Sequence, residues 1–166
     1  MSKIKLFIAD VDGTLTNGLY HVSTSGEVSR SYHTRDFHGL HMLNNAGVKV
    51  CIMTMAKSQD IFFQKEKAAK YATLFTGVED KKKTIEQILG EDLTWKDIAY
   101  IGDDTVDEGI LKAAGLAACP ADADSSVLKL IGERVDGFIS RFPGGQGAVR
   151  QFAEYVLKVN NNANKH

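Results

Sequence analysis

The sequence has few of the features that mark membrane-spanning or nucleic-acid-binding proteins. Its 166 residues carry a net charge of −1 at pH 7, so no basic excess favours binding to nucleic acid or to an anionic membrane surface. No apolar run approaches the ~18 residues that a membrane-spanning helix needs. The start, MSKIKLFIAD, indicates a charged lead into a strand and not a signal peptide. We therefore expect a cytoplasmic protein that has no nucleic-acid or membrane partner.

Cysteine is also scarce. Only Cys51 and Cys119 occur, each inside an apolar run, which is typical of buried thiols in a reducing compartment. A disulfide is therefore not expected. Hydrophobic residues make up 43% of the chain and charged residues 25%, which is ordinary for a globular protein. This length predicts a single domain over residues 1–166, with a polar and flexible tail at about 159–166.

Short apolar runs alternate with amphipathic stretches along the chain. We expect strands at 3–9, 47–54, 72–76, 97–102 and 115–119, and helices near 37–46, 58–70, 81–90, 105–114, 124–132 and 145–158. This alternation predicts a doubly wound α/β fold, in which helices cover both faces of a parallel sheet. Residues 19–33 depart from it, and two short stretches around Ser25-Gly26 predict a β-hairpin insertion.

Polar side chains follow three of the predicted strands: Asp10 and Asp12 the first, Thr54 the second, and Asp103, Asp104 and Asp107 the fourth. Ligands of open α/β sheets bind beyond the carboxyl ends of the strands, so we expect these side chains to converge. Carboxylates that lie together repel one another unless a cation is present. Hard oxygen ligands favour Mg²⁺ over Zn²⁺. The sequence therefore predicts a Mg²⁺ site at this edge of the sheet.

The segment Asp10-Val11-Asp12-Gly13-Thr14-Leu15-Thr16 closes the first predicted strand. A strand followed by an Asp/Gly turn is common, but D-x-D-G-T arises by chance in roughly one chain in a thousand of this size. The segment resembles the first signature of the haloacid dehalogenase (HAD) phosphatases. This resemblance implies that Asp10 attacks phosphorus to form an aspartyl-phosphate, while Asp12 acts as general acid and base. Residues i and i+2 at the end of a strand point to the same side, so Asp10 can attack phosphorus while Asp12 protonates the leaving oxygen.

Two further segments resemble the HAD signatures that bind the phosphoryl group. Thr54 corresponds to the residue that hydrogen-bonds phosphate, although a Thr at a strand end is often only structural. Lys81-Lys82-Lys83 begins a predicted helix, where most of a basic run is usually a solvated face. The resemblance requires one lysine near the helix start, and the spacing after Gly77 favours Lys81, with Lys82 as the alternative.

The segment Ile101-Gly102-Asp103-Asp104-Thr105-Val106-Asp107 resembles the fourth signature. Helix capping is the ordinary reading of such an Asp pair. The resemblance implies that Asp103 ligates Mg²⁺ directly, together with Asp10 and the backbone carbonyl of Asp12. It places Asp107, and more remotely Asp104, in the shell around the metal.

Few residues separate the first two signatures, so no cap domain fits between them, and we expect an open, capless site. A neighbouring subunit is one way to cover such a site, and the hairpin at 19–33 is the candidate contact. Over nearly the whole chain the pattern resembles the 3-deoxy-D-manno-octulosonate (KDO) 8-phosphate phosphatases. The segments D-V-D-G-T-L-T-N-G, Y-H-T-R-D-F-H-G-L, A-Y-I-G-D-D-T-V-D and G-G-Q-G-A-V-R-Q-F carry this resemblance. It implies a phosphorylated sugar acid as substrate and a homotetramer.

The same pattern is similar to phosphatases of nine-carbon sugar acids, the KDN and N-acetylneuraminate 9-phosphates, and to the C-terminal domain of CMP-sialic acid synthetases. Where these phosphatases have Gly followed by Arg or Glu, this chain has Met55 and Ala56. The sugar therefore stays open, and Lys57, Lys67 or Arg150 is a candidate cation for the substrate carboxylate. The alternatives are another small sugar or nucleotide phosphate as substrate, and a non-catalytic tetramerisation domain.

Overall fold

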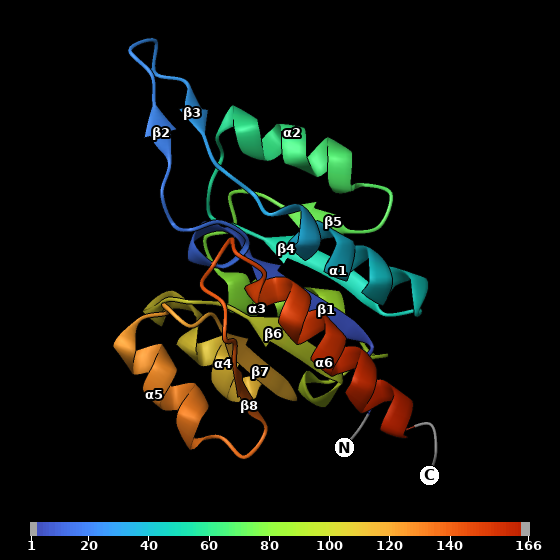
Figure 1. Cartoon of the computed structure of the whole chain (residues 1–166). Helices are drawn as coiled ribbons and strands as arrows, with labels where there is room; N and C mark the ends of the chain where they lie inside the picture. The colour runs from blue at the N-terminus through green and yellow to red at the C-terminus, as the bar shows by residue number, and fades with distance from the viewer. Residues whose placement is uncertain (1–2, 164–166) are drawn as a thin grey trace.

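Six parallel strands form the centre of the protein in the computed structural model, which describes residues 3–163 apart from the side chains of residues 62 and 63 (Figure 1). In chain order they are β1 (Leu6–Asp10), β4 (Lys49–Met53), β5 (Thr73–Phe75), β6 (Ile98–Ile101), β7 (Leu116–Cys119) and β8 (Gly137–Ile139). Their order across the sheet is β5-β4-β1-β6-β7-β8. The chain builds outward from β1 to β5 and then returns to β6 on the other side of β1. The carboxyl ends of β1 and β6 therefore border the crevice where doubly wound sheets bind ligands.

Helices cover both faces of the sheet, which confirms the predicted fold class. The helices are α1 (Thr34–Asn45), α2 (Gln59–Ala68), α3 (Lys81–Leu89), α4 (Glu108–Ala113), α5 (Ser125–Glu133) and α6 (Ala148–Ala163). On one face Phe7 of β1 packs in a hydrophobic cluster with side chains of α1, α2 and α6. On the other face Leu6 and Ile8 of β1 pack with side chains of α3, α4 and α5. The alternation along β1 is the two-residue period of a strand that is buried on both sides.

The strands differ from the sequence expectation mainly at the edge of the sheet. The five predicted strands are present, and β8 is a sixth that the sequence did not predict. It has only three residues, and Ile139 is 43% exposed, so it lacks the continuous apolar run of a central strand. Its pairing with β7 extends the sheet at that edge.

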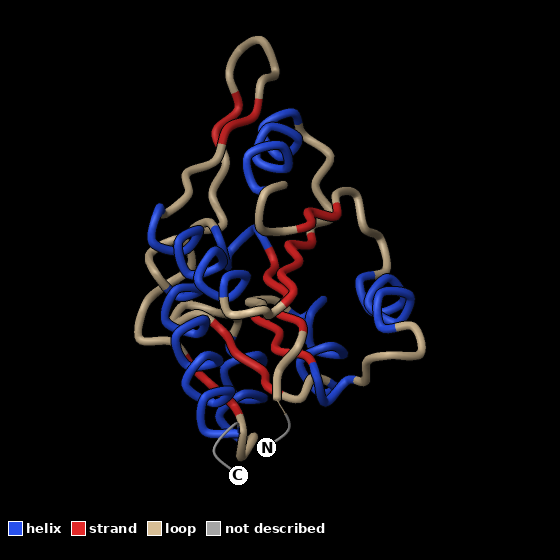
Figure 2. Tube along the Cα trace, turned by 90° about the vertical axis from the view of Figure 1, so that its right-hand side faces the viewer, coloured by secondary structure: helices blue, strands red, loops and turns tan. Residues whose placement is uncertain are grey.

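The predicted hairpin is present but short, with β2 (His21–Val22) antiparallel to β3 (Val28–Ser29). Gly26 has a φ of +82° in its turn, a conformation that favours glycine. Figures 1 and 2 show the hairpin projecting from the body of the molecule beside the start of α2. Within residues 3–163, no separate folded unit lies over the sheet.

Helix α6 continues into the segment that was expected to be a polar tail. Asn160 is buried and closes a pair of hydrogen bonds with Ile4, accepting from its N–H and donating to its carbonyl oxygen, both at 2.8 Å. These bonds fix the last turns of α6 to the residue that leads into β1. The expected tail therefore includes helix up to Ala163, and residues 164–166 lie outside the described residues.

No described helix combines the length and the apolar character required to cross a membrane. Cys51 and Cys119 are free and buried, as predicted. Burial raises the pKa of the Cys51 thiol to about 11 and that of Cys119 to about 12, so both stay protonated near neutral pH.

Candidate active site

The site is built around the single turn η1 (Val11–Leu15), which follows Asp10 at the end of β1. Gly13 in this turn has a φ of +83°, and any side chain on it would overlap the Asp103 carboxylate. Thr14 Oγ1 donates a hydrogen bond to Asp103 Oδ1 at 3.0 Å. The glycine therefore permits both the turn and the close approach that brings the first and fourth motifs together.

Three carboxylates meet at this point, as the sequence predicted for the strand ends. Asp10, Asp103 and Asp107 offer oxygen atoms that lie within 4.8 Å of one another, and we call these residues the carboxylate cluster. Lys81 Nζ lies 2.8 Å from Asp10 Oδ1 and 2.9 Å from Asp107 Oδ1. Tyr100 donates its hydroxyl proton to the same Asp107 oxygen at 2.6 Å. The cluster thus consists of two buried acids that pair with Lys81 and of Asp103, which is half-buried.

Burial and the repulsion of neighbouring carboxylates raise the pKa values of Asp10 and Asp103. Burial raises the pKa of Asp10 to about 7, helped by the charge of Asp107 and opposed by Lys81. Burial also raises the pKa of Asp103 to about 6, although the Thr14 hydroxyl opposes it. Burial alone would lower the pKa of Lys81, but Asp10 and Asp107 outweigh it and raise the value. One lysine cannot balance three carboxylates, so the site favours an additional cation.

The donor atoms fit a hard divalent cation. Asp107 Oδ2 is buried and has no hydrogen-bond partner within residues 3–163, whereas its Oδ1 is taken by Lys81 and Tyr100. Leaving such an oxygen unpaired is costly, and a metal ion would satisfy it. The available ligands are all oxygen atoms, which suits Mg²⁺. Asp107, expected only in the outer shell, thus has a carboxylate oxygen within 4.8 Å of oxygens of both other acids.

The remaining predicted acids lie outside the carboxylate cluster. Asp104 caps the short helix η3 (Thr105–Asp107), where its Oδ1 accepts the N–H of Thr105 at 2.6 Å. The Asp12 carboxylate instead bonds Arg30, with Arg30 Nε 2.6 Å from Asp12 Oδ1. The side chains of Asp104 and Asp12 are therefore not among the clustered acids.

The two predicted phosphate-binding residues are both buried at the edge of the site. Thr54 follows Met53, which is the register partner of Asp10 in the sheet, and its Oγ1 accepts the N–H of Ala56 at 3.0 Å. Lys81 opens α3 with only 6% of its side chain exposed, whereas Lys82 is exposed. Of the two lysines that the sequence left open, the structure brings Lys81 to the carboxylates.

Arg30 is the residue that the sequence analysis missed. It bonds Asp12 and also bonds Ser58 and Asp60 at the start of α2, and we call these four residues the Arg30 network. The network joins the hairpin, η1 and α2. No spacing rule connects an arginine after a hairpin strand to an acid 18 residues earlier, so the sequence carries no local signal for it.

A hollow of about 290 Å³ lies over Lys81. Met55 and Val106 line it and are 53% and 60% exposed. Met55 is one of the two residues that replace the charged pattern of the sugar-acid phosphatases. Met55 and Val106 therefore bring no charge to this hollow, and the charged groups that line it beside Lys81 are Glu79, Asp80 and Lys82.

The glycine-rich segment before α6 packs against η1. Gly145 donates its N–H to the carbonyl of Thr14 at 2.9 Å, and a side chain on Gly144 would overlap the carbonyl of Gly13. The segment therefore serves close packing against η1. This agrees with the sequence, which lacks the Lys-Ser/Thr of a P-loop there.

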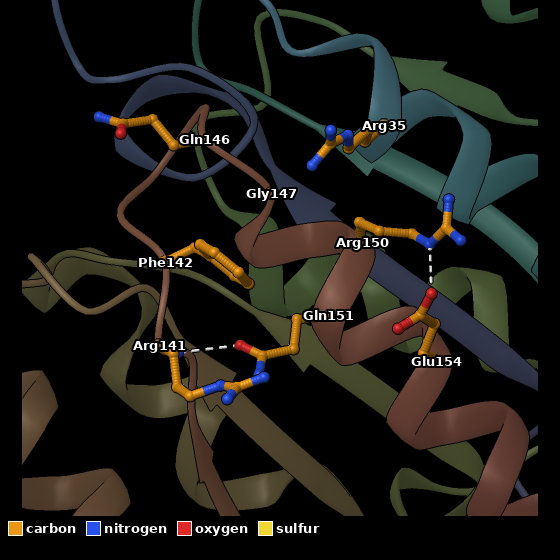
Figure 3. A pocket seen from close by; sticks show the side chains of 8 residues that line it. All are labelled: Arg35, Arg141, Phe142, Gln146, Gly147, Arg150, Gln151 and Glu154. Atoms are coloured by element: carbon orange, nitrogen blue, oxygen red, sulfur yellow. Dashed lines mark hydrogen bonds and ion pairs between the residues drawn. The ribbon is translucent and has the colours of Figure 1, made fainter.

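A larger hollow of about 470 Å³ lies between α1, α6 and the segment after β8, and Figure 3 shows Arg35 and Arg150 at one end of it and Arg141 at the other. None of the predicted catalytic or metal-binding residues lines it. Arg150, one of the three candidate cations for a substrate carboxylate, forms an ion pair with Glu154 at 2.7 Å. Lys57, another candidate, has its Nζ 3.7 Å from Oε1 of Glu79.

No family model matches the chain. The KDO 8-phosphate phosphatase KdsC of Haemophilus influenzae is 31% identical over 160 residues, which cover 96% of this chain and 86% of that protein. The chain belongs to the KDO 8-phosphate phosphatase family of the HAD superfamily. N-acylneuraminate cytidylyltransferase A of Danio rerio is 33% identical over 161 residues, and the chain spans about a third of that protein, 36% of its length.

Solved structures of this phosphatase family share the fold. The Moraxella catarrhalis KDO 8-phosphate phosphatase, in complex with magnesium, phosphate and KDO, has a TM-score of 0.85 and 27% identity. The match covers 96% of this chain and 89% of that one. The cobalt-bound Haemophilus influenzae enzyme also has a TM-score of 0.85, with 29% identity over 96% and 90% of the two chains. Both relatives hold a divalent metal, and the carboxylate cluster is compatible with one.

Proposed function

We propose that this chain is a Mg²⁺-dependent phosphomonoester hydrolase that works through an aspartyl-phosphate on Asp10. The observation that carries the proposal is the position of Asp10 at the carboxyl end of β1, 2.8 Å from Lys81 and within the carboxylate cluster. A buried carboxylate beside a lysine and a cation site is suited to attack a phosphoryl group, whose negative charge would otherwise repel it.

The proposed reaction has two steps. An oxygen of Asp10 attacks phosphorus while Lys81 and Thr54 hold the phosphoryl oxygens, and the bond to the sugar oxygen breaks as Asp12 gives that oxygen a proton. Asp12 then takes a proton from a water molecule, whose oxygen attacks phosphorus and releases phosphate and free Asp10. Asp10, Asp103 and the backbone carbonyl of Asp12, with Asp107 alongside, would hold Mg²⁺, which would withdraw charge from the phosphoryl oxygens.

The proposed substrate is a 2-keto-3-deoxy sugar acid phosphate, either KDO 8-phosphate or a KDN or N-acetylneuraminate 9-phosphate. Relatives named for KDO 8-phosphate and for N-acylneuraminate support this class of sugar acid. Lys57, Lys67 and Arg150 remain the candidates for the substrate carboxylate. Another small sugar or nucleotide phosphate is the alternative that the uncharged Met55 and Ala56 leave open.

A second candidate function is non-catalytic assembly. It is favoured by the 33% identity with a cytidylyltransferase, a protein named for a different reaction. Retention of Asp10, Asp12, Lys81 and Asp103 counts against it, because an assembly domain needs none of these side chains.

We further propose that the chain forms one catalytic domain without a cap and assembles as a homotetramer in the cytoplasm. The exposed apolar residues Leu19, Tyr20 and Val22 at the hairpin support a subunit contact. The two free thiols support a reducing compartment.

Phosphate release from a panel of substrates tests these proposals. The panel contains KDO 8-phosphate, KDN 9-phosphate, N-acetylneuraminate 9-phosphate, a hexose phosphate and a nucleoside monophosphate, each with Mg²⁺. We expect one of the three sugar acids to give the highest kcat/KM. A preference for the hexose or nucleotide would replace the substrate proposal, and no release from any compound would favour the assembly role.

A further inference from the structure

Arg30 lies where the hairpin returns to the body of the protein, directly after β3. Its Nε donates to Asp12 Oδ1 at 2.6 Å and its Nη2 donates to Asp12 Oδ2 at 3.4 Å. Two such contacts match the fork of a guanidinium to the two oxygens of a carboxylate. The Arg30 side chain is only 6% exposed, against 40% for Asp12. A buried cation therefore holds a carboxylate that is itself partly exposed.

Groups on the other side hold Arg30 independently of Asp12. Its Nη1 donates to both Asp60 oxygens, at 3.0 and 2.9 Å, and to Ser58 Oγ at 2.9 Å. The ring of Tyr20, from the other arm of the hairpin, lies 5.4 Å from the guanidinium carbon. Because none of these contacts involves Asp12, the guanidinium stays in place when the Asp12 side chain gives or takes a proton.

We infer that Arg30 is the positioning residue for Asp12 and fixes the direction from which the proton reaches the leaving oxygen. This rests on the proposed role of Asp12 as general acid and base, and it adds the residue that orients it. A partly exposed carboxylate on a turn has several side-chain rotamers, and only some bring it within the about 3 Å that proton transfer requires. A two-point contact with a fixed planar group selects one of them.

The arrangement of charge favours this role over simple anchoring of the hairpin. Asp60, whose side chain is 15% exposed, and Ser58 would by themselves complete a buried site for the guanidinium. The additional contact with Asp12 places the same cation on the catalytic turn. The hairpin thereby supplies a group to the site of its own subunit, apart from any contact that its tip makes.

Substituted phenyl phosphates test the inference, because their leaving groups differ in their need for a proton. Phenolate leaves poorly without one, whereas 2,4-dinitrophenolate leaves readily. For Arg30→Gln we expect kcat/KM to fall about 10²-fold on phenyl phosphate and to stay within about threefold on 2,4-dinitrophenyl phosphate. Arg30→Lys keeps the charge but not the fork, and should lose about tenfold on phenyl phosphate.

Arg134 supplies the matched control, since it is also an arginine held by several bonds. Its side chain is 17% exposed, and it donates to Asp136 and to the carbonyls of Leu111 and Ala114. None of these partners belongs to the site. Arg134→Gln should therefore leave the ratio of the two rates unchanged, whatever it does to stability.

Equal losses on both phosphates in Arg30→Gln, or no loss on either, would overturn the inference and leave the phosphatase proposal standing. Circular dichroism checks that each variant is folded. If Arg30→Gln unfolds, the losses of kcat/KM on the two phenyl phosphates are compared in Arg30→Lys instead, and equal losses there would overturn the inference. A parent protein that releases phosphate from no aryl or sugar phosphate would instead overturn the proposed function, and with it this inference.

Discussion

The carboxylate cluster and the Arg30 network lie on either side of one short turn, yet their charges are balanced in opposite ways. In the cluster, three carboxylates lie together with one lysine, which pairs with Asp10 and Asp107, so negative charge is in excess and a metal ion is favoured. In the network, Arg30 is itself held by two carboxylates and a hydroxyl. The Asp10 side chain is 9% exposed, whereas the Asp12 side chain is 40% exposed. In the proposed mechanism, bond formation to phosphorus therefore belongs to the buried side, and proton transfer to the side that the hairpin completes.

The largest effect should come from removing the nucleophile on the buried side. Asp10→Asn keeps the size of the side chain but cannot form the aspartyl-phosphate, so kcat should fall by about 10⁴-fold or more. Steady-state phosphate release measures it, with circular dichroism as the check on folding. Asp92→Asn, an exposed change elsewhere, is the control and should remain at the parent rate. Asp10→Asn activity within tenfold of the parent would show that another group attacks phosphorus.

The second largest effect should be on metal binding, which should depend on the carboxylate cluster and not on the Arg30 network. EDTA should remove turnover and added Mg²⁺ should restore it, because the cluster carries uncompensated negative charge. Asp103→Asn should weaken Mg²⁺ affinity about 10–100-fold, by the loss of a charged ligand. Asp12→Asn should leave it within about threefold, because its side chain faces Arg30. Isothermal titration calorimetry measures both, and equal weakening would mean that the Asp12 carboxylate also reaches the metal.

The pKa shifts predict how Mg²⁺ stabilises the protein at different pH. The pKa of Asp10 is raised from 3.8 to about 7 and that of Asp103 to about 6, so the folded state binds protons more tightly than the unfolded state. Without metal, stability should therefore fall as pH rises from about 4 to 7. Mg²⁺ replaces these protons, so its effect on Tm should grow from pH 5 to pH 8, reaching about 5–10 °C at a hundredfold excess over Kd.

Differential scanning fluorimetry in EDTA and in MgCl₂ tests this dependence. Asp103→Asn should flatten it, whereas Asp12→Asn should keep it. A Tm shift that is the same at every pH would show that the cluster carboxylates are already ionised before the metal binds.

The smallest effect on chemistry should come from the hairpin tip. Val22 is 60% exposed, and Val22→Asp places a charge in the proposed subunit contact while sparing Arg30. We expect the homotetramer to dissociate and kcat/KM to fall more on a sugar acid phosphate than on phenyl phosphate, which should stay within about threefold. Sedimentation and paired kinetics measure both. An unchanged assembly would remove the hairpin tip from the interface.

Deleting residues 21–31 would not test the same point, because the deletion also removes Arg30. A loss of activity would then combine the loss of assembly with the loss of the group that orients Asp12. The point substitution keeps these two contributions apart.

The sequence predicted those elements whose residues have a periodic or strand-end pattern. β1, β4, β6 and β7 are apolar runs because parallel strands are buried on both faces. β8 was missed because three half-exposed residues give no such run, and the end of α6 was missed because Asn160-Asn161-Asn162 resembles a tail. Only the bonds between Asn160 and Ile4, 156 residues apart, explain why helix continues there.

The sequence by itself determined the α/β order of elements and the acids that meet at the sheet edge. Asp10, Thr54 and Asp103 follow the ends of strands, and parallel strands bring such residues together wherever the sheet forms. The tertiary structure alone decided which acids share the lysine and which face Arg30. Those contacts join η1, the hairpin and α2 across loops, and no fixed period relates residues that loops bring together. The proposed nucleophile could therefore be named from the sequence, whereas the group proposed to orient the general acid could not.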